Sequence, residues 1–375
     1  MKKIVVVTNS MVYGGIEKSL IVLLHYLIIN NDVTLILASK DGELFSKIPE
    51  KVKIKIMYKG QKKNLLKMYY KLRLRTTKNF SKECNILTKI YDHDDETYDL
   101  AIAYSTPVSL PNYYVIRNLI AKKKIMYLHN DIDRISVSPL SSKLLFRKYD
   151  NIIAVSYNCK KSFIELFPEL SNKVIILENL VDETNILKLS YEPIIPKTFD
   201  RGFIHICTVG RIEREKGQDI VPEVLFLLKQ KRYNVKWHLI GDGSLVKTIT
   251  DRADELKVSD MMVFEGYQDN PYKYMRSSDI YVQTSRQEGF CITLKEAKIL
   301  RKIIISTDFP TAYEQINNNI NGVIVPFDPL SLATAVIKII EDNKMRNTLL
   351  NNLIHIDNRT SSDALDKFLE EVFDE

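Results

Sequence analysis

The chain has 375 residues, more than one ordinary hydrophobic core organises, so its length predicts two domains. Its composition, 45% hydrophobic and 27% charged, is typical of a soluble globular protein. The four scattered cysteines lack CxxC spacing, which disfavours a disulfide framework or a zinc site. No apolar run approaches the ~20 residues that span a bilayer, and the chain opens on a short strand-like run without a signal peptide. We therefore expect a cytoplasmic protein, and the net charge of +7 favours acidic partners without identifying them.

The first predicted unit is a strand, a glycine turn and a helix. Residues 4–8 form an apolar run, Gly14 and Gly15 follow, and residues 16–29 carry leucines at helical spacing. This order can seat a phosphate, or it can be a plain strand-to-helix turn. It lacks the GxGxxG spacing of dinucleotide sites, so an NAD enzyme is disfavoured.

Two oppositely charged segments follow the predicted strands at residues 33–38 and 52–57. Residues 59–82 carry nine Lys or Arg and no acid, with leucines and tyrosines interleaved, which indicates a basic, partly amphipathic helix. Two interpretations stay open for this segment: contact with an anionic membrane surface, or packing on the first domain. The acidic residues 92–96 contain an Asp-x-Asp pattern, which can bind a metal. Because they precede a predicted strand at residues 98–104, we expect a solvated loop there and no metal site.

A histidine ends another predicted strand. Residues 125–128 form a short apolar run, and His129 follows directly. The carboxyl ends of parallel strands are where α/β folds bind ligands, so His129 is a candidate catalytic residue, although a lone histidine is often structural. Further strands are predicted within residues 149–156 and 173–182.

The chain divides near residues 191–202, which include two prolines and show neither strand nor helix periodicity. Strand and helix patterns alternate again from residue 203. We therefore predict a first domain over residues 1–190, a linker over 191–202 and a second domain over 203–355. An amphipathic helix within residues 356–375 is expected to pack back on the first domain.

Two cations follow the first strand of the predicted second domain. Arg211 and Lys216 lie five residues apart in the sequence Gly-Arg-Ile-Glu-Arg-Glu-Lys-Gly. Arginine offers a fork of donors to phosphate oxygens and lysine a compact charge, so both suit a phosphate that gains charge as it leaves. The alternative is a run of ordinary surface charges, which fits Arg214 well.

Residues 285–300 carry the strongest motif. Glu288 lies on a predicted strand-to-helix turn and Glu296 lies eight residues further, inside the helix. Gly289 permits close approach of the backbone to a ligand. Unpaired amides at a helix start favour an anion, and here they would come from Cys291, Ile292 and Thr293. Two carboxylates around a phosphate seat suit a nucleotide sugar.

This stretch resembles the Glu-x7-Glu signature of glycosyltransferase family 4, whose members are retaining enzymes of GT-B fold, here of the kind that assembles bacterial polysaccharides. The resemblance implies an α/β, GT-B architecture, with two Rossmann-like parallel-sheet domains facing an interdomain cleft. It extends to the Gly-Arg…Lys-Gly motif and is strong over residues 203–345 but thin over the first domain. The chain departs from the family pattern at Glu178, Leu180 and residues 309–312, which leaves the sugar and the acceptor open.

The resemblance also assigns roles to single residues. Glu296 would hold the ribose hydroxyls, while Glu288 with the backbone of Gly289 and Phe290 would hold the sugar. Arg211, Lys216, Glu288 and His129 would form the catalytic set. The remaining donor-binding residues would come from the helix start and three glycine-bearing loops: Gly15, Gly241, Tyr267, Cys291, Ile292 and Thr293.

We therefore expect a retaining, metal-independent hexosyltransferase without a cofactor. It would move sugar from a nucleoside-diphosphate (UDP or GDP) donor to a glycan or lipid-linked acceptor in cell-surface polysaccharide synthesis. It would act in the cytoplasm and bind no nucleic acid, and a peripheral position at the inner face of the membrane stays open. Retention would follow a front-face path, and Asp131 stays open as a nucleophile. The alternatives are a sugar-nucleotide epimerase of similar fold and a non-catalytic nucleotide-sugar or glycan-binding module.

Overall fold

The structure, a computed structural model, describes residues 1–58, 91–130, 139–194, 199–354 and 360–374, with the single positions 84, 86, 88, 89 and 132. The basic segment 59–82 and Asp131, both named in the sequence analysis, lie outside the described residues. The chain forms two compact units. Met1–Leu180 and Arg359–Glu375 make the first, and Val181–Asn358 makes the second.

The first unit is built on a parallel sheet with the strand order β3-β2-β1-β4-β5-β6-β7. Its strands are β1 (Lys2–Thr8), β2 (Asn31–Leu37), β3 (Lys53–Ile56), β4 (Asp94–Ala103), β5 (Leu119–Leu128), β6 (Asn151–Ala154) and β7 (Val174–Ile176). Strands of this kind are buried on both faces and therefore read as continuous apolar runs. Residues 4–7 of β1 show this, since all four are fully buried.

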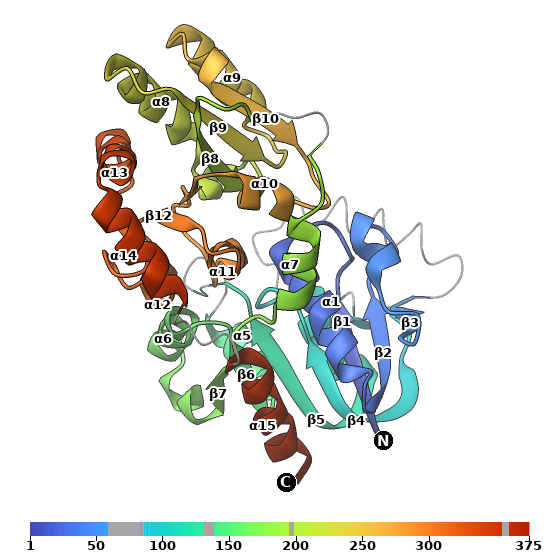
Figure 1. Ribbon diagram of the computed structural model, residues 1–375. Helices are drawn as coiled ribbons and strands as arrows, with labels where there is room; N and C mark the ends of the chain where they lie inside the picture. Colours follow the sequence, from blue (N-terminus) through green and yellow to red (C-terminus); the bar gives the residue numbers. More distant parts are fainter. Residues whose placement is uncertain are drawn as a thin grey trace. The chain divides into compact units, whose positions relative to one another are not determined.

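The described helices of the first unit connect its strands or end the chain (Figure 1). They are α1 (Gly15–Leu27), α4 (Leu110–Asn118), α5 (Pro139–Phe146), α6 (Tyr157–Leu166) and α15 (Thr360–Asp374), with 3-10 turns η1 (Glu43–Lys47) and η3 (Pro168–Lys173). In α1, Leu20, Leu23, Leu24 and Leu27 are buried, as their spacing predicts. The last helix of the chain belongs to this unit, and the Lys2 ammonium lies 5.0 Å from the Phe373 ring centroid.

The second unit is built on a parallel sheet with the strand order β10-β9-β8-β11-β12-β13. Its strands are β8 (Ile204–Val209), β9 (Val235–Ile240), β10 (Met262–Gly266), β11 (Ile280–Gln283), β12 (Ile303–Thr307) and β13 (Val323–Val325). Its helices are α7 (Glu183–Ser190), α8 (Val221–Gln230), α9 (Val246–Glu255), α10 (Tyr272–Ser277), α11 (Ile292–Ile299), α12 (Pro310–Gln315), α13 (Pro329–Glu341) and α14 (Asn343–Ile354). Short 3-10 turns, η4 (Arg214–Lys216), η5 (Gln218–Ile220) and η6 (Ser259–Met261), complete it.

Alternate residues of these strands build two cores, one on each face of the second sheet. Ile280 and Val282 of β11 pack with α8, α9 and α13, whereas Tyr281 between them packs with α10 and α11. This is the two-residue period of a strand. The sheet is therefore covered by helices on both faces, the arrangement of a doubly wound α/β domain.

The structure differs from the sequence analysis at two points. The division falls between Leu180 and Val181, earlier than the expected linker at 191–202, because α7 packs on α10 and α11 of the second unit. The acidic residues 94–96 begin strand β4, whereas a solvated loop was expected. Lys55 neutralises Asp94 and Glu96 there, at 2.8 and 3.0 Å. Its hydrogen bond is the main reason that the pKa of Glu96 falls to about 2.

Within the part of the chain that the structure describes, no helix combines the length and the apolar character needed to cross a membrane. The same residues contain no group of three or more His, Cys, Asp or Glu side chains that could hold a metal ion. All four cysteines are buried and none forms a disulfide.

Candidate donor site

The candidate site lies at the point where the strand order of the second sheet reverses. Strand β8 lies beside β9 on one side and β11 on the other, so their connections leave the sheet in opposite directions. Doubly wound sheets bind ligands at the carboxyl ends of strands at such a switch point. Arg211 and Lys216 follow β8, and Glu288 follows β11, so the topology brings the two sequence motifs together.

An ion pair joins these motifs. The Lys216 Nζ lies 2.6 Å from Glu288 Oε1 and 2.8 Å from Oε2. The side chains are only 23% and 11% exposed. Burial alone would lower the pKa of Lys216, but the Glu288 carboxylate more than offsets it and raises that pKa. The Glu288 carboxylate therefore favours the cationic form of Lys216.

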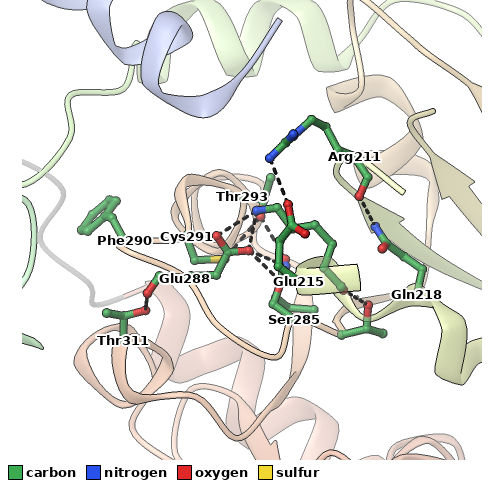
Figure 2. A network of polar contacts seen from close by, with 12 residues as sticks. Arg211, Glu215, Gln218, Ser285, Glu288, Phe290, Cys291, Thr293 and Thr311 are labelled. Carbon is green, nitrogen blue, oxygen red and sulfur yellow. Dashed lines mark hydrogen bonds and ion pairs between the residues drawn. The ribbon is translucent and has the colours of Figure 1, made fainter. Parts of the chain in front are cut away.

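A chain of buried polar groups ends on the same carboxylate (Figure 2). The Ser285 hydroxyl donates to Glu288 Oε1 at 2.6 Å. The Gln283 amide donates to Ser285 Oγ at 2.7 Å, and its oxygen accepts from the Tyr281 and Thr293 hydroxyls at 2.6 and 2.9 Å. Glu288 is thus fixed both by a cation and by a neutral network.

The turn that carries Lys216 is pressed against the turn that carries Glu288. Gly217 has φ +69°, and a Cβ there would meet the Thr284 carbonyl oxygen at 2.0 Å. The Thr284 hydroxyl donates to the Lys216 carbonyl at 2.8 Å. Arg286 makes a bidentate pair with Asp219 at 2.6 and 2.7 Å. Glycine at position 217 is therefore required by both its φ and this close approach.

Arg211 lies further out than Lys216. Its Nη2 donates to Glu215 Oε1 at 3.1 Å, and the two side chains are 60% and 40% exposed. Its backbone carbonyl accepts a hydrogen bond at 2.9 Å from Gln218, a buried residue (Figure 2). A guanidinium held only by a solvent-exposed pair can turn toward an anion at little cost.

Helix α11 opens directly beside Glu288. Cys291 precedes it with φ +62°, and the helix begins at Ile292 and Thr293. The peptide carbonyl of Glu288 accepts a hydrogen bond from Thr311 at 3.1 Å, and that of Cys291 accepts one from Gln315 at 3.3 Å. Burial raises the pKa of the Cys291 thiol, which is therefore neutral.

Glu296 lies inside α11 and is only 2% exposed. The Tyr272 hydroxyl donates to its Oε1 at 2.9 Å. Its Oε2 is buried and has no hydrogen-bond partner among the described residues. A buried carboxylate oxygen without a donor is costly, and a ligand hydroxyl would satisfy it.

The two predicted nucleotide-side loops end neighbouring strands. Gly241 follows β9 with φ +147°, and a Cβ there would meet the Gly210 carbonyl oxygen at 2.0 Å. Its amide donates to the Gly266 carbonyl at 2.8 Å. Tyr267 follows β10, is 39% exposed, and donates its hydroxyl to Asp269 at 2.7 Å.

The other two predicted site residues belong to the first unit. Gly15 is exposed and is the first residue of α1, after an extended Gly14. His129 follows β5 and is buried between Tyr104 and Tyr127, whose ring centroids lie 4.4 and 5.4 Å away. Neither ring nitrogen has a hydrogen-bond partner among the described residues. Burial lowers the pKa of His129 to about 3.

The sequence analysis named Lys216, Glu288 and Glu296 as candidates but did not name the groups that hold them in the structure. Tyr281, Gln283 and Ser285 recur at every second position through β11 and just beyond. Such spacing places them on one face of the strand. Polar side chains at every second position of a buried strand, and at the next such position beyond its end, were the sequence signal that could have identified the network.

Comparison with known proteins identifies relatives of this chain. Residues 195–354 match the family model described as glycosyl transferases group 1. An uncharacterised glycosyltransferase of Methanocaldococcus jannaschii is 29% identical over 274 residues, 70% of this chain and 66% of the relative. An N-acetylgalactosaminyltransferase of Campylobacter jejuni, which acts on a diphospho-undecaprenol-linked sugar, is 26% identical over 65% of this chain and 63% of the relative. This chain thus spans just under two-thirds of the length of each.

Solved structures resemble the whole chain. Anabaena HepE in complex with UDP-glucose has a TM-score of 0.73 at 18% identity, covering 99% of this chain and 100% of that one. TarM of S. aureus has a TM-score of 0.71 at 14% identity, covering 100% of both chains. The two doubly wound parallel sheets are therefore the two domains of a GT-B fold, and the second of them carries the match to glycosyl transferases group 1.

Proposed function

We propose that the protein is a retaining glycosyltransferase that moves a hexose-type sugar from a nucleoside-diphosphate donor to a glycan or lipid-linked acceptor. The observation that carries the proposal is the pair of buried carboxylates at the switch point of the second sheet. Glu288 is clamped to a cation, and Glu296 keeps one oxygen unpaired among the described residues. A donor with phosphates and hydroxyls would engage both.

The two cations, Lys216 and Arg211, would stabilise the leaving diphosphate. Cleavage of the bond between the sugar and the diphosphate leaves negative charge on the phosphate oxygens, and fixed positive groups stabilise that charge. In this proposal Lys216 exchanges Glu288 for the diphosphate, and Arg211 turns from Glu215 to the same oxygens. The amides at the start of α11 and the positive end of its dipole add favourable potential.

The two carboxylates contact different ends of the donor. Glu296 accepts hydrogen bonds from the ribose hydroxyls through its Oε2. Glu288, once Lys216 has turned to the diphosphate, accepts from hydroxyls of the sugar beside the backbone of Gly289 and Phe290. The acceptor would bind on the first domain and attack on the face from which the diphosphate leaves, which retains the configuration.

The names of related proteins support the class of substrate. Relatives and structural neighbours include a capsular polysaccharide glycosyltransferase of Staphylococcus aureus, 26% identical over 60% of this chain, and HepE in complex with UDP-glucose. We therefore propose a UDP-sugar donor and a role in assembling a surface polysaccharide.

Substitution of the two glutamates tests the proposal. Glu296→Ala should weaken binding of free UDP about tenfold, because a hydrogen bond to a carboxylate is worth roughly 1.5–3 kcal/mol. Glu288→Ala should leave UDP affinity within about twofold and lower kcat/KM for the UDP-sugar. Calorimetry with UDP and turnover of a nucleotide-sugar panel measure the two effects. Equal losses of UDP affinity would contradict the assignment, and donor binding without any transfer would favour a non-catalytic module.

A further inference from the structure

We propose that Ser285 is the positioning residue of the Glu288 carboxylate. Through it, Gln283 and Tyr281 keep that carboxylate in place when Lys216 turns to the donor. The inference rests on the proposed function, in which Glu288 contacts the donor sugar. It assigns roles to neutral residues that themselves touch neither the sugar nor the diphosphate.

The ionised carboxylate determines the direction of every hydrogen bond in the network. An ionised carboxylate only accepts, so Ser285 must use its single proton to donate to Glu288 Oε1. Ser285 Oγ can then only accept from Gln283, which fixes the amide nitrogen of Gln283 toward Ser285. The amide oxygen is thereby turned to the Tyr281 hydroxyl, which donates to it at 2.6 Å.

The network is buried and is anchored at its far end. Tyr281 and Ser285 are fully buried and Gln283 is 2% exposed. Thr293 of α11 adds a second donor to the Gln283 oxygen at 2.9 Å. Because water does not compete there, and because the donors polarise one another, the network holds one geometry of the carboxylate.

The two oxygens of Glu288 are left unequal. Oε1 accepts from Ser285 at 2.6 Å, from Lys216 at 2.6 Å and from Gln283 at 3.4 Å. Among the described residues, Oε2 accepts only from Lys216, at 2.8 Å. When Lys216 turns to the diphosphate, Ser285 still holds Oε1 and Oε2 becomes available to a sugar hydroxyl. Ser285 is therefore needed while the nucleotide sugar is bound, after Lys216 has separated from Glu288.

A double-mutant cycle tests this role. Ser285→Ala should lower kcat/KM for the nucleotide sugar about tenfold and leave the Kd of UDP within about twofold. In a Glu288→Gln background the same substitution should have little further effect, because a residue that acts only through Glu288 has nothing left to position. Ser306→Ala is the matched control, since Ser306 is equally buried on β12, pairs in register with Gln283, and donates to the Thr307 carbonyl.

Gln283→Glu provides a second variant of nearly unchanged shape. It places a second carboxylate beside Glu288 and the Lys216 cation, so donor turnover should fall relative to wild type and recover in part at lower pH, as one of the two carboxyls is protonated. Equal losses from Ser285→Ala in the wild-type and Glu288→Gln backgrounds would overturn the inference, as would a parallel loss of UDP affinity. Absence of transfer by the wild-type protein with every nucleotide sugar would instead remove the proposed function, and this inference with it.

Discussion

The imidazole of His129 is held by aromatic rings and by burial, without an ionic partner among the described residues. Tyr127 is nearly parallel to it, with an interplanar angle of 13°, and Tyr104 meets it at 60°. Taking an imidazolium out of water is costly, which is why burial lowers the pKa of His129 to about 3. The ring is therefore neutral at physiological pH, a state that can accept a hydrogen bond from a substrate hydroxyl.

This neutrality can be measured directly. In NMR spectra of histidine-labelled protein, the His129 resonance should remain that of a neutral ring from pH 7 to pH 5, whereas exposed imidazoles titrate near 6.5. The protein has six histidines, so a His129→Gln variant provides the assignment by loss of one resonance. Titration of that resonance near pH 6.5 would show that the ring is solvated.

The low pKa of His129 also determines whether its contribution to stability rises or falls with pH. Between pH 6.5 and pH 3 the unfolded chain binds a proton at position 129 and the folded chain does not. The contribution of His129 to stability is therefore full above pH 6.5 and is lost as the pH falls through this window. Between pH 7 and pH 5, the free energy of unfolding of the wild-type protein should therefore fall by about 2 kcal/mol more than that of His129→Gln.

At the scale of elements, the turn after β8 is fixed by its contact with the turn after β11. Gly217 and Gly266 have nearly equal φ values, +69° and +66°. A Cβ at Gly217 would meet the Thr284 carbonyl at 2.0 Å and the Phe327 ring at 2.7 Å, whereas at Gly266 it meets nothing within 4 Å. Substitutions at these two glycines therefore distinguish the free-energy cost of the left-handed backbone from the cost of the steric contact at Gly217.

Gly266→Ala should destabilise the second unit by about 1 kcal/mol, the usual penalty of a left-handed backbone. Gly217→Ala should cost clearly more and should also weaken UDP binding, because the displaced Thr284 leads directly into Ser285 and Glu288. Unfolding by denaturant, monitored through the fluorescence of Trp237, measures the free energy of unfolding of each variant. Trp237 is the single tryptophan of the chain and is fully buried in the second unit. Equal costs at the two glycines would show that the contact at Gly217 is not rigid.

Periodicity predicted most of the described elements, because buried parallel strands and amphipathic helices leave clear patterns. It failed where long-range contacts decide the local structure. The start of β4 looked like a solvated acidic loop because the lysine that neutralises Asp94 and Glu96 lies on another strand. Helix α7 looked like part of the first domain, although the Asn270 side chain donates to the Leu189 carbonyl at 2.8 Å and ties it to the second.

The candidate site was predictable residue by residue but not as an arrangement. Lys216 and Glu288 stand out in separate motifs, yet only the pairing of β8 with β11 shows that they form an ion pair. Arg211 stands in the same motif as Lys216, but its pairing with Glu215 leaves it much more exposed. Such differences depend on the tertiary environment of each charge, which a sequence pattern does not contain.

At the scale of the whole molecule, we propose that the reaction uses the charges of the protein in place of a divalent ion. Lys216 and Arg211 supply positive charge where the diphosphate would leave, and α11 adds the positive end of its dipole. Transfer should therefore persist in excess EDTA, with initial rates within about twofold of those without chelator. Complete loss of transfer, restored by Mg²⁺ or Mn²⁺, would show that the diphosphate is held in another way.

The distribution of charge along the chain leads to a prediction about location. The net charge is +7, and residues 59–82, which lie outside the described part of the structure, alone contain nine Lys or Arg and no acid. Each basic residue near an anionic leaflet contributes about 1 kcal/mol to binding, and the interleaved leucines and tyrosines can enter the interface. A transferase with a lipid-linked acceptor would gain from this placement.

Co-sedimentation with vesicles distinguishes membrane contact from ordinary packing of this segment. The wild-type protein should sediment with phosphatidylserine-containing vesicles at low salt, remain in the supernatant with neutral vesicles, and be released by added salt, because exposed charges are screened. Replacing Lys62, Lys63 and Lys67 by Gln should weaken sedimentation. A matched triple replacement of Lys229, Lys231 and Lys247 in the second unit removes the same charge elsewhere and should not. If the wild-type protein stays in the supernatant with anionic vesicles at low salt, the segment does not bind membranes and a soluble acceptor is favoured.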